Sequence, residues 1–335
     1  MRSRRRRRCR QCLLNPRCTK PSNLSFPLRL TKIGRRGFSL RKRRRIGVAL
    51  GGGGARGFAH LGVLIALEEN DIPVDVIAGT SIGATIGAAK AIGTDLDKLN
   101  QLLSCLNLNE LLQISESTMR EVRRAIGRGM VEYVRGSSWR EEETAPEKLA
   151  RMYELFSLLT AKKSFSEVKI PFAAVATDLE SGERVALTEG KLYHAVTASA
   201  AVPGIFYPVA HEGRYLIDGG IIDKIPVDVT IDMGAEVVIA VDTSSPLTRR
   251  VDTSFDALFQ AQRITSQRLT TLQLEQARKR LDGRLLLLQP DVGWITMFAF
   301  EHLQDAVRAG KEETLSHIST IKKLCGIRNR SPSHH

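Results

Sequence analysis

The sequence predicts an α/β fold in which a mostly parallel sheet carries helices on its faces. From residue 46 onward, short apolar runs rich in β-branched residues alternate with longer helical stretches, which is the pattern of successive βαβ units. The chain has 335 residues, 42% of them hydrophobic, so it is long enough to bury a core of its own. No uninterrupted apolar run reaches the roughly 18 residues that a membrane-spanning helix needs, so no such helix is expected.

The expected elements follow this alternation in order along the chain. Strands are predicted at residues 46–50, 74–78, 172–177, 215–217, 237–241 and 285–288. Helices are expected after Gly57, Ile82 and Lys191, and two long amphipathic helices at residues 252–281 and 301–324. The charged, mostly helical stretch 100–165 interrupts this alternation, so we expect it to be an insertion or cap on one domain, residues 46–325.

The first 45 residues differ in character from the rest of the chain. They hold 18 of the 50 Lys and Arg and none of the 36 Asp and Glu, so the net charge of +14 becomes −4 over the remaining 290 residues. Without a sustained apolar period, this basic arm is expected to be disordered, as is the tail 326–335. We expect the arm to attach the protein to an anionic membrane. An RNA-binding arm, a transit peptide or a start codon placed too far upstream would look the same, although the acidic body argues against a nucleic-acid partner.

The five cysteines predict neither a metal site nor a disulfide framework. Cys9 and Cys12 have the spacing of half a zinc site, but a closed site needs four ligands, and no His or further pair of Cys lies nearby. The odd count and the absence of a secretory apolar segment favour a reducing, cytoplasmic compartment, with the arm giving peripheral contact to the inner face of the membrane. No cofactor is expected.

A glycine-rich loop, GGGGARG at residues 51–57, lies between a predicted strand and a predicted helix. Successive glycines let backbone N–H groups point into open space at a helix N-terminus, where an anion is favoured. Gly52, Gly54 and Gly57 also satisfy G-x-G-x-x-G. Glycine-rich loops of this kind also bind nucleotides, but both nucleotide interpretations lack a second requirement. A phosphate-binding loop would need Lys and then Ser or Thr after the last glycine, and a dinucleotide site would need an acidic residue at the end of the second strand.

The sequence GTSIG at residues 79–83 fits a G-x-S-x-G nucleophile elbow. Gly79 and Gly83 permit a sharp turn that lifts Ser81 onto the tip between strand and helix. The small residues of the following helix allow it to pack close to the sheet. A strand before, a helix after and an anion-binding loop one βα unit earlier together point to a nucleophilic serine.

The sequence IDGG at residues 217–220 ends another predicted strand. Taken alone, an Asp followed by two glycines is typical of a tight turn. A nucleophilic serine, however, needs a group to take its proton, and Asp218 is an acidic residue at a strand end where Gly219 and Gly220 leave room for close approach.

These residues resemble the patatin-like phospholipases, in particular their bacterial branch. The resemblance rests on GGGGARG, GTSIG and DGG in this order, with stretches such as TASAAVPGIF and IPVDVTIDMGAEVVIAVD, and it is dense over residues 46–242. It implies a three-layer α/β/α sandwich with a mixed central sheet. It also implies a Ser–Asp dyad instead of a triad.

By position, the resemblance makes Ser81 the nucleophile and Asp218 the proton acceptor. It places the oxyanion hole at the backbone of Gly52, Gly53 and Gly54, with Arg56 fixing that loop. Supporting positions are Gly57, Gly79, Gly83, Gly219 and Gly220. One departure concerns substrate positioning: where the family often has Asn after DGG, this chain has Asp223 and Lys224.

The predicted function is that of a serine acyl hydrolase, a phospholipase- or lysophospholipase-type esterase that cleaves fatty acyl esters of lipids. One alternative is an α/β-hydrolase with a Ser-His-Asp triad, for which His302 or His317 would be the histidine, while His60 and His194 are expected to pack on helices. Another is a non-catalytic nucleotide- or lipid-binding regulator that uses the glycine loop alone. The sequence names neither the lipid head group nor the oligomeric state.

Overall fold

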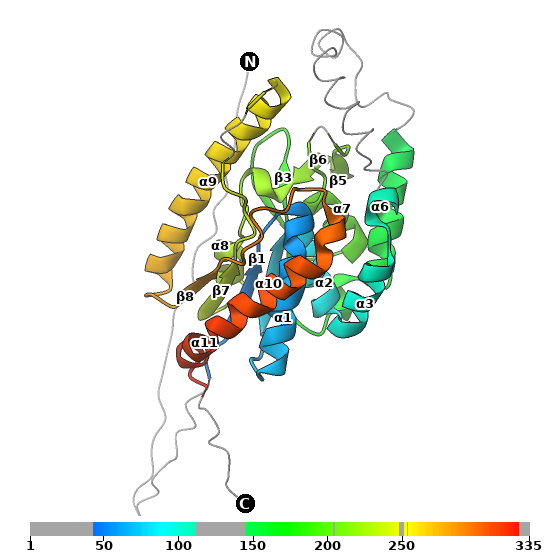
Figure 1. The fold of residues 1–335 in the computed structure, drawn as a ribbon. Coiled ribbons are helices and arrows are strands. Elements are labelled where there is room, and N and C mark those ends of the chain that lie inside the picture. The colour runs from blue at the N-terminus through cyan, green and yellow to red at the C-terminus, as the bar shows by residue number, and fades with distance from the viewer. Residues whose placement is uncertain (1–42, 112–144, 204, 248–250, 253, 328–335) are drawn as a thin grey trace, which may run out of the picture. The chain divides into compact units, whose positions relative to one another are not determined.

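A mixed sheet between two layers of helices forms the body of the protein (Figure 1). The computed structural model describes residues 43–111, 145–203, 205–247, 251–252 and 254–327. The described sheet has eight strands in the order β5-β6-β3-β2-β1-β7-β8, with β4 paired to β3. The strands are β1 Ile46–Leu50, β2 Val76–Thr80, β3 Phe172–Asp178, β4 Arg184–Leu187, β5 Val209–His211, β6 Arg214–Asp218, β7 Val237–Val241 and β8 Leu285–Leu288.

The order in which the chain adds strands to the sheet reverses at β1. Strands β1, β2, β3, β7 and β8 are parallel, whereas β4 and β6 run antiparallel to β3, and β5 runs antiparallel to β6. The chain adds β2 and β3 on one side of β1 and returns later to add β7 and β8 on the other. In open sheets of this kind, ligand sites form at the carboxyl ends of the strands where the order switches. Here those are the ends of β1, β2 and β7.

The helices are divided unequally between the two faces of the sheet. One face packs against α1 Ala59–Glu69, α2 Ile82–Ala91, α3 Leu96–Cys105, α4 Leu108–Leu111, α6 Ala145–Leu159, α7 Leu192–Ser199, α10 Leu303–Ser316 and α11 Ile318–Cys325. The other packs against α8 Val227–Asp232 and α9 Ser254–Arg280. This is the predicted three-layer α/β/α sandwich with a mixed, mostly parallel sheet, and the prediction is confirmed.

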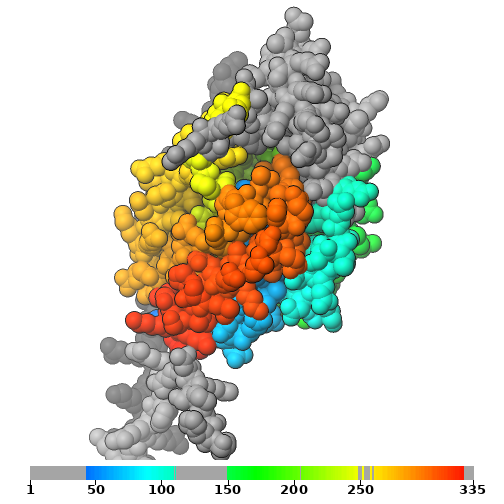
Figure 2. Space-filling model, in the orientation of Figure 1, coloured from blue at the N-terminus to red at the C-terminus, as the bar shows by residue number. Residues whose placement is uncertain are grey.

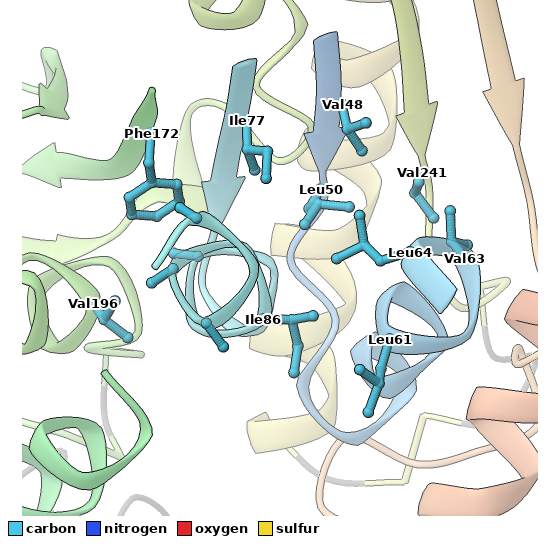
Figure 3. Packing of buried hydrophobic residues seen from close by; sticks show 14 of the residues in the cluster. Val48, Leu50, Leu61, Val63, Leu64, Ile77, Ile86, Phe172, Val196 and Val241 are labelled. Carbon is cyan, nitrogen blue, oxygen red and sulfur yellow. The ribbon is translucent and has the colours of Figure 1, made fainter. Parts of the chain in front are cut away.

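Alternating side chains of the central strands supply both halves of the core. In β1, Val48 and Leu50 face α1 and α2, while Ala49 lies in the opposite cluster with α8 and α9. Figure 3 shows Val48, Leu50 and Ile77 on the same side of the sheet as Ile86 of α2. Strands buried on both faces read as continuous apolar runs, and such runs predicted these strands.

Most predicted elements match the observed ones, with differences at weak signals. The strands predicted at 46–50, 237–241 and 285–288 have those bounds, and the other three differ by up to two residues at either end. Strands β4 and β5 were not predicted, because they are short and partly exposed. The helix predicted at 301–324 is two helices, α10 and α11, because the backbone leaves the helical conformation at His317.

Some predictions lie outside the described residues or stay untested. Residues 1–42, 112–144 and 328–335 are not described, so the basic arm, the tail and the limits of the insertion stay predictions. None of the helices within the described ranges is both long enough and apolar enough to cross a bilayer.

Helices α1 and α10 approach each other closely through two glycines. A Cβ atom at Gly62 would overlap the carbonyl oxygen of Val307, and one at Gly310 would overlap the carbonyl oxygen of Ala59. Figure 2 shows the orange and red chain of α10 and α11 crossing over the blue of α1. The absence of a side chain at both positions therefore sets the distance between the two helices.

We expect Gly310→Ala to destabilise the protein. Alanine favours an isolated helix over glycine by about 1 kcal/mol, but overpacking costs about 1–3 kcal/mol, so the free energy of unfolding should fall overall. Urea denaturation followed by circular dichroism measures it. Glu312→Ala, at an exposed position of the same helix, is the control and should change the value by less than about 0.5 kcal/mol. An unchanged or higher stability of Gly310→Ala would contradict the close crossing.

Candidate active site

Ser81 forms the tip of a strained turn between β2 and α2. Its backbone has φ 57° and ψ −124°, in a region that a residue with a Cβ rarely adopts. The turn closes because two neighbours lack side chains. A Cβ at Gly79 would overlap the carbonyl of Gly83, and a Cβ at Gly83 would overlap the carbonyl of Leu50. This is the geometry expected of a nucleophile elbow.

Ser199, at the end of α7, is hydrogen-bonded to the backbone of this turn. Its hydroxyl accepts a hydrogen bond from the N–H of Ser81 at 2.9 Å and donates one to the carbonyl of Val175 in β3 at 2.5 Å. Ser199 is fully buried, so no water replaces these bonds. A single hydroxyl thus ties the elbow to the neighbouring strand and to α7.

Asp218 lies level with Ser81 because of strand register. Thr80 of β2 pairs with Val175, and the next residue of β3, Ala176, pairs with Asp218 of β6. The Asp218 carboxylate accepts a hydrogen bond from the N–H of Gly220 at 2.7 Å. The Ser81 hydroxyl lies close enough to lower the pKa of that carboxylate. The structure therefore places the two predicted catalytic side chains next to each other, in the lining of one cavity.

Burial makes Asp218 a stronger base than an ordinary aspartate. Only 6% of the residue is exposed, and desolvation raises its pKa to about 6. The hydrogen bonds from Ser81 and Gly220 and the charge of Lys224 act in the opposite direction. No cation lies within 4 Å of this carboxylate among the described residues.

The glycine loop approaches the elbow with two free amides. The N–H of Gly52 is engaged, donating to the carbonyl of Lys224 at 2.9 Å, and that of Ala55 donates to Met297 at 2.8 Å. Between them, the amides of Gly53 and Gly54 have no hydrogen-bond acceptor within the described chain. Gly54 has φ +60°. The predicted oxyanion hole included the amides of all three glycines. The Gly52 amide already donates to Lys224, so the amides of Gly53 and Gly54 are the two that remain available to a ligand.

Arg56, at the end of this loop, is anchored to two distant segments of the chain. Its buried guanidinium donates to the carbonyls of Thr243 at 3.0 Å and Ile295 at 2.9 Å. Burial lowers its pKa to about 10. Next to it, Gly57 leaves space for Ile82, since a Cβ there would overlap that side chain. Loop and elbow are therefore packed directly against each other.

The histidines of the described residues lie elsewhere, each with its own partners. His60 is buried in α1, donates from Nε2 to the carbonyl of Gly51 at 2.6 Å and, because burial lowers its pKa to about 4, is neutral at pH 7. His302 contacts Asp305 at 3.1 Å, His194 contacts Tyr153 at 3.0 Å, and His317 lies beside Glu313. In the described part of the chain, no histidine lines a cavity next to Ser81. The geometry does not support a triad.

An apolar cavity extends from Ser81 toward α3 and α6. It is narrow, about 90 Å³, and its walls include Ile86, Leu103 and Phe156. Helices α3 and α6 fall within or next to the stretch 100–165, so the described part of that stretch contributes walls to this cavity. Its shape and lining suit an apolar chain.

A second cavity, more polar than the first although most of its lining is apolar, also borders Ser81 and is called the polar cavity below. It measures about 470 Å³ and is lined by the glycine loop, Asp218, Lys224 and residues of α9. Val202 and Met297 border both cavities. Ser81 thus lies where an apolar and a polar compartment meet, which suits the junction between the two parts of an amphipathic molecule.

The structure defines a class of α/β/α sandwich proteins in which a serine at a strained strand–helix turn lies beside a buried aspartate and a glycine-rich loop. Within that class, this chain belongs to the patatin-like phospholipase family, whose profile matches residues 48–231, more than half of the chain.

Relatives share this region at about one third identity. An uncharacterized NTE family protein of Mycobacterium bovis is 32% identical over 197 residues, 59% of this chain and 48% of that protein. Patatin-like phospholipase domain-containing protein 7 of Rattus norvegicus is 32% identical, over 60% of this chain and 14% of its own length. Lysophospholipase NTE1 of Mycosarcoma maydis is 33% identical, over 60% and 10%. The chain therefore spans half or less of the length of these relatives.

Among solved structures, VipD from Legionella pneumophila aligns with a TM-score of 0.42 and 16% identity. The alignment covers 83% of this chain and 67% of that chain.

Sequence reasoning missed several residues that build the site. Ser199 stands in an ordinary stretch of small residues, and Thr243 follows β7 without any motif. Lys224 was noted only as a departure from the family, although a lone Lys within the apolar run of IIDKIPV is a usable signal. Distant backbone carbonyls such as those of Ile295 and Met297 leave no trace in sequence.

We expect Ser199→Ala to destabilise the fold by more than its size suggests. The change leaves the N–H of Ser81 and the carbonyl of Val175 buried without partners, and each such group costs about 1–3 kcal/mol. Urea denaturation measures the loss, and Ser316→Ala on the surface is the matched control. Equal stabilities of the two variants would show that Ser199 does not hold the elbow.

Proposed function

We propose that the protein is a serine acyl hydrolase that cleaves a fatty acyl ester of a lipid, with Ser81 as nucleophile and Asp218 as proton acceptor. The observation that carries the proposal is that Ser81, in a strained turn, lies beside a buried Asp218 and lines both the apolar and the polar cavity. Membership of the patatin-like phospholipase family supports it. So do relatives named as lysophospholipases.

In the first half of the reaction, the Ser81 oxygen attacks the ester carbonyl. Its proton passes to Asp218, and a tetrahedral intermediate with a negatively charged oxygen forms. The free amides of Gly53 and Gly54 stabilise that oxygen, and the protonated Asp218 returns the proton to the leaving alcohol. Loss of one such donor typically slows turnover on the order of 100- to 1000-fold.

In the second half, water hydrolyses the acyl-enzyme. Asp218 accepts a proton from the water, which attacks the ester carbon, and the Ser81 oxygen leaves with that proton. The acyl chain lies in the apolar cavity, lined by groups such as Ile86 and Phe156. The alcohol part lies in the polar cavity. Attachment of the arm 1–45 to an anionic membrane stays a prediction.

Ser81→Ala and Asp218→Asn should each abolish hydrolysis of p-nitrophenyl butyrate and labelling by a fluorophosphonate, with losses in kcat on the order of 10⁴ or more. His302→Ala and His317→Ala should retain most of the activity, because no imidazole takes part. Thermal melting shows that each variant is folded. Labelling at a residue other than Ser81 would refute the assignment. If nothing were labelled, the binding-protein alternative would be favoured, and a histidine variant as inactive as Ser81→Ala would favour the triad.

The rate should depend on pH through Asp218. The carboxylate accepts a proton only when ionised, so with its pKa raised to about 6 by burial, kcat/KM should rise about tenfold per pH unit below that value and level off above it. The charge of Lys224 lowers this pKa, so Lys224→Met should move the inflection to higher pH. Initial rates with a neutral ester between about pH 5 and 8 measure both effects. A flat wild-type profile would contradict the role of Asp218.

A further inference from the structure

The polar cavity next to Ser81 gathers positive charge. Arg56, Lys224 and Arg263 line it together with Asp218, the one acidic residue among its described lining residues. Arg56 is occupied by two backbone carbonyls that hold the glycine loop. Lys224 and Arg263 are the cations left to meet a ligand.

Lys224 combines burial with the lack of a close counter-ion. Its carbonyl accepts the N–H of Gly52, which places the residue beside the glycine loop. Burial lowers the pKa of its ammonium, and the more distant charges of Asp242 and Asp218 act in the opposite direction and raise that pKa. No carboxylate lies within 4 Å of that ammonium in the described part of the chain. A partly desolvated cation of this kind is stabilised when an anion binds beside it.

Arg263 faces the same space from α9. Ser266 and Gln267, within about one turn of it, hold α9 over the site by donating to the carbonyls of Gly220 at 3.5 Å and Ser245 at 3.2 Å. The charge of Arg263 lowers the pKa of both Lys224 and Arg56, so the three cations repel one another. This repulsion is relieved by an anion placed between them.

We propose that Lys224 and Arg263 form a subsite for the phosphate group of a lipid head group, so that the site prefers acyl esters that carry a phosphate near the scissile bond over neutral esters. This proposal rests on the proposed function. Two donors with unlike geometry, a point-like ammonium and a forked guanidinium, suit the several oxygens of a phosphate. Because Ser81 lines the same cavity, the phosphate and the ester belong to one molecule.

Binding is tested first, in a background that cannot turn over. Calorimetry measures the affinity of full-length Ser81→Ala for 1-hexanoylglycerol 3-phosphate, a short-chain ester used as a dissolved monomer so that attraction of the basic arm to a charged surface does not contribute. We expect Lys224→Met to weaken binding about 10- to 100-fold and Arg263→Gln to weaken it similarly. Arg268→Gln, which removes the same charge from α9 outside the cavity, is the matched control and should not change the affinity. Equal affinities in all variants would overturn the subsite.

Selectivity is tested next, in the active protein. The ratio of kcat/KM for 1-hexanoylglycerol 3-phosphate to that for 1-hexanoylglycerol should exceed about 10 and fall about 10- to 100-fold in Lys224→Met and in Arg263→Gln. Arg263→Gln, at an exposed position, keeps the test valid if Lys224→Met does not fold. A ratio near one in the wild type, with inorganic phosphate alone inhibiting in a Lys224-dependent way, would assign the subsite to free phosphate and overturn the lipid assignment. Lys224-dependent binding without any hydrolysis would uphold the subsite and refute the proposed function.

Discussion

The site depends on one constraint: at the carboxyl ends of the parallel strands, backbone turns must pack directly against the backbone of neighbouring strands. The elbow around Ser81 touches the end of β1 only because Gly83 has no side chain, and the DGG turn touches β3 only because Gly219 has none. A methyl group at Gly83 would push the elbow away from β1, and a methyl group at Gly219 would push the DGG turn away from β3. The glycines therefore act by allowing contact, and each is matched to one particular carbonyl or side chain on a neighbouring element.

Burial of two carboxylates in this region places function and stability in opposition. Desolvation raises the pKa of Asp218 and of Asp223 to about 6. A raised pKa means that the folded protein holds these protons more tightly than the unfolded chain, so the associated stability is present at low pH and is lost as pH rises through about 6. Arg184 offsets this loss for Asp223 by an ion pair at 2.8 Å. Asp218 has no such close partner in the described chain, which keeps it available as a base.

The sequence predicted local features well and long-range contacts poorly. The strands of the parallel core and the elbow follow from apolar runs and glycine spacing, which are local properties. The engagement of the Gly52 amide by the carbonyl of Lys224 joins residues 172 positions apart, and backbone groups carry no sequence signature. The same reason explains why Ser199 was missed, since its role lies in two hydrogen bonds to other elements. Short strands such as β5 escape prediction because three residues give no period.

The region that matches the family is not a self-sufficient unit in this protein. It ends at residue 231, yet β7 and β8 complete the sheet beyond it, and α10 closes one face of α1. The carbonyls of Thr243, Ile295 and Met297, all beyond that boundary, hold the glycine loop in place. A truncated or fused version of the protein that ended at the limit of the family match would thus lose the segments that support the loop. Such a version should extend at least to the end of α10.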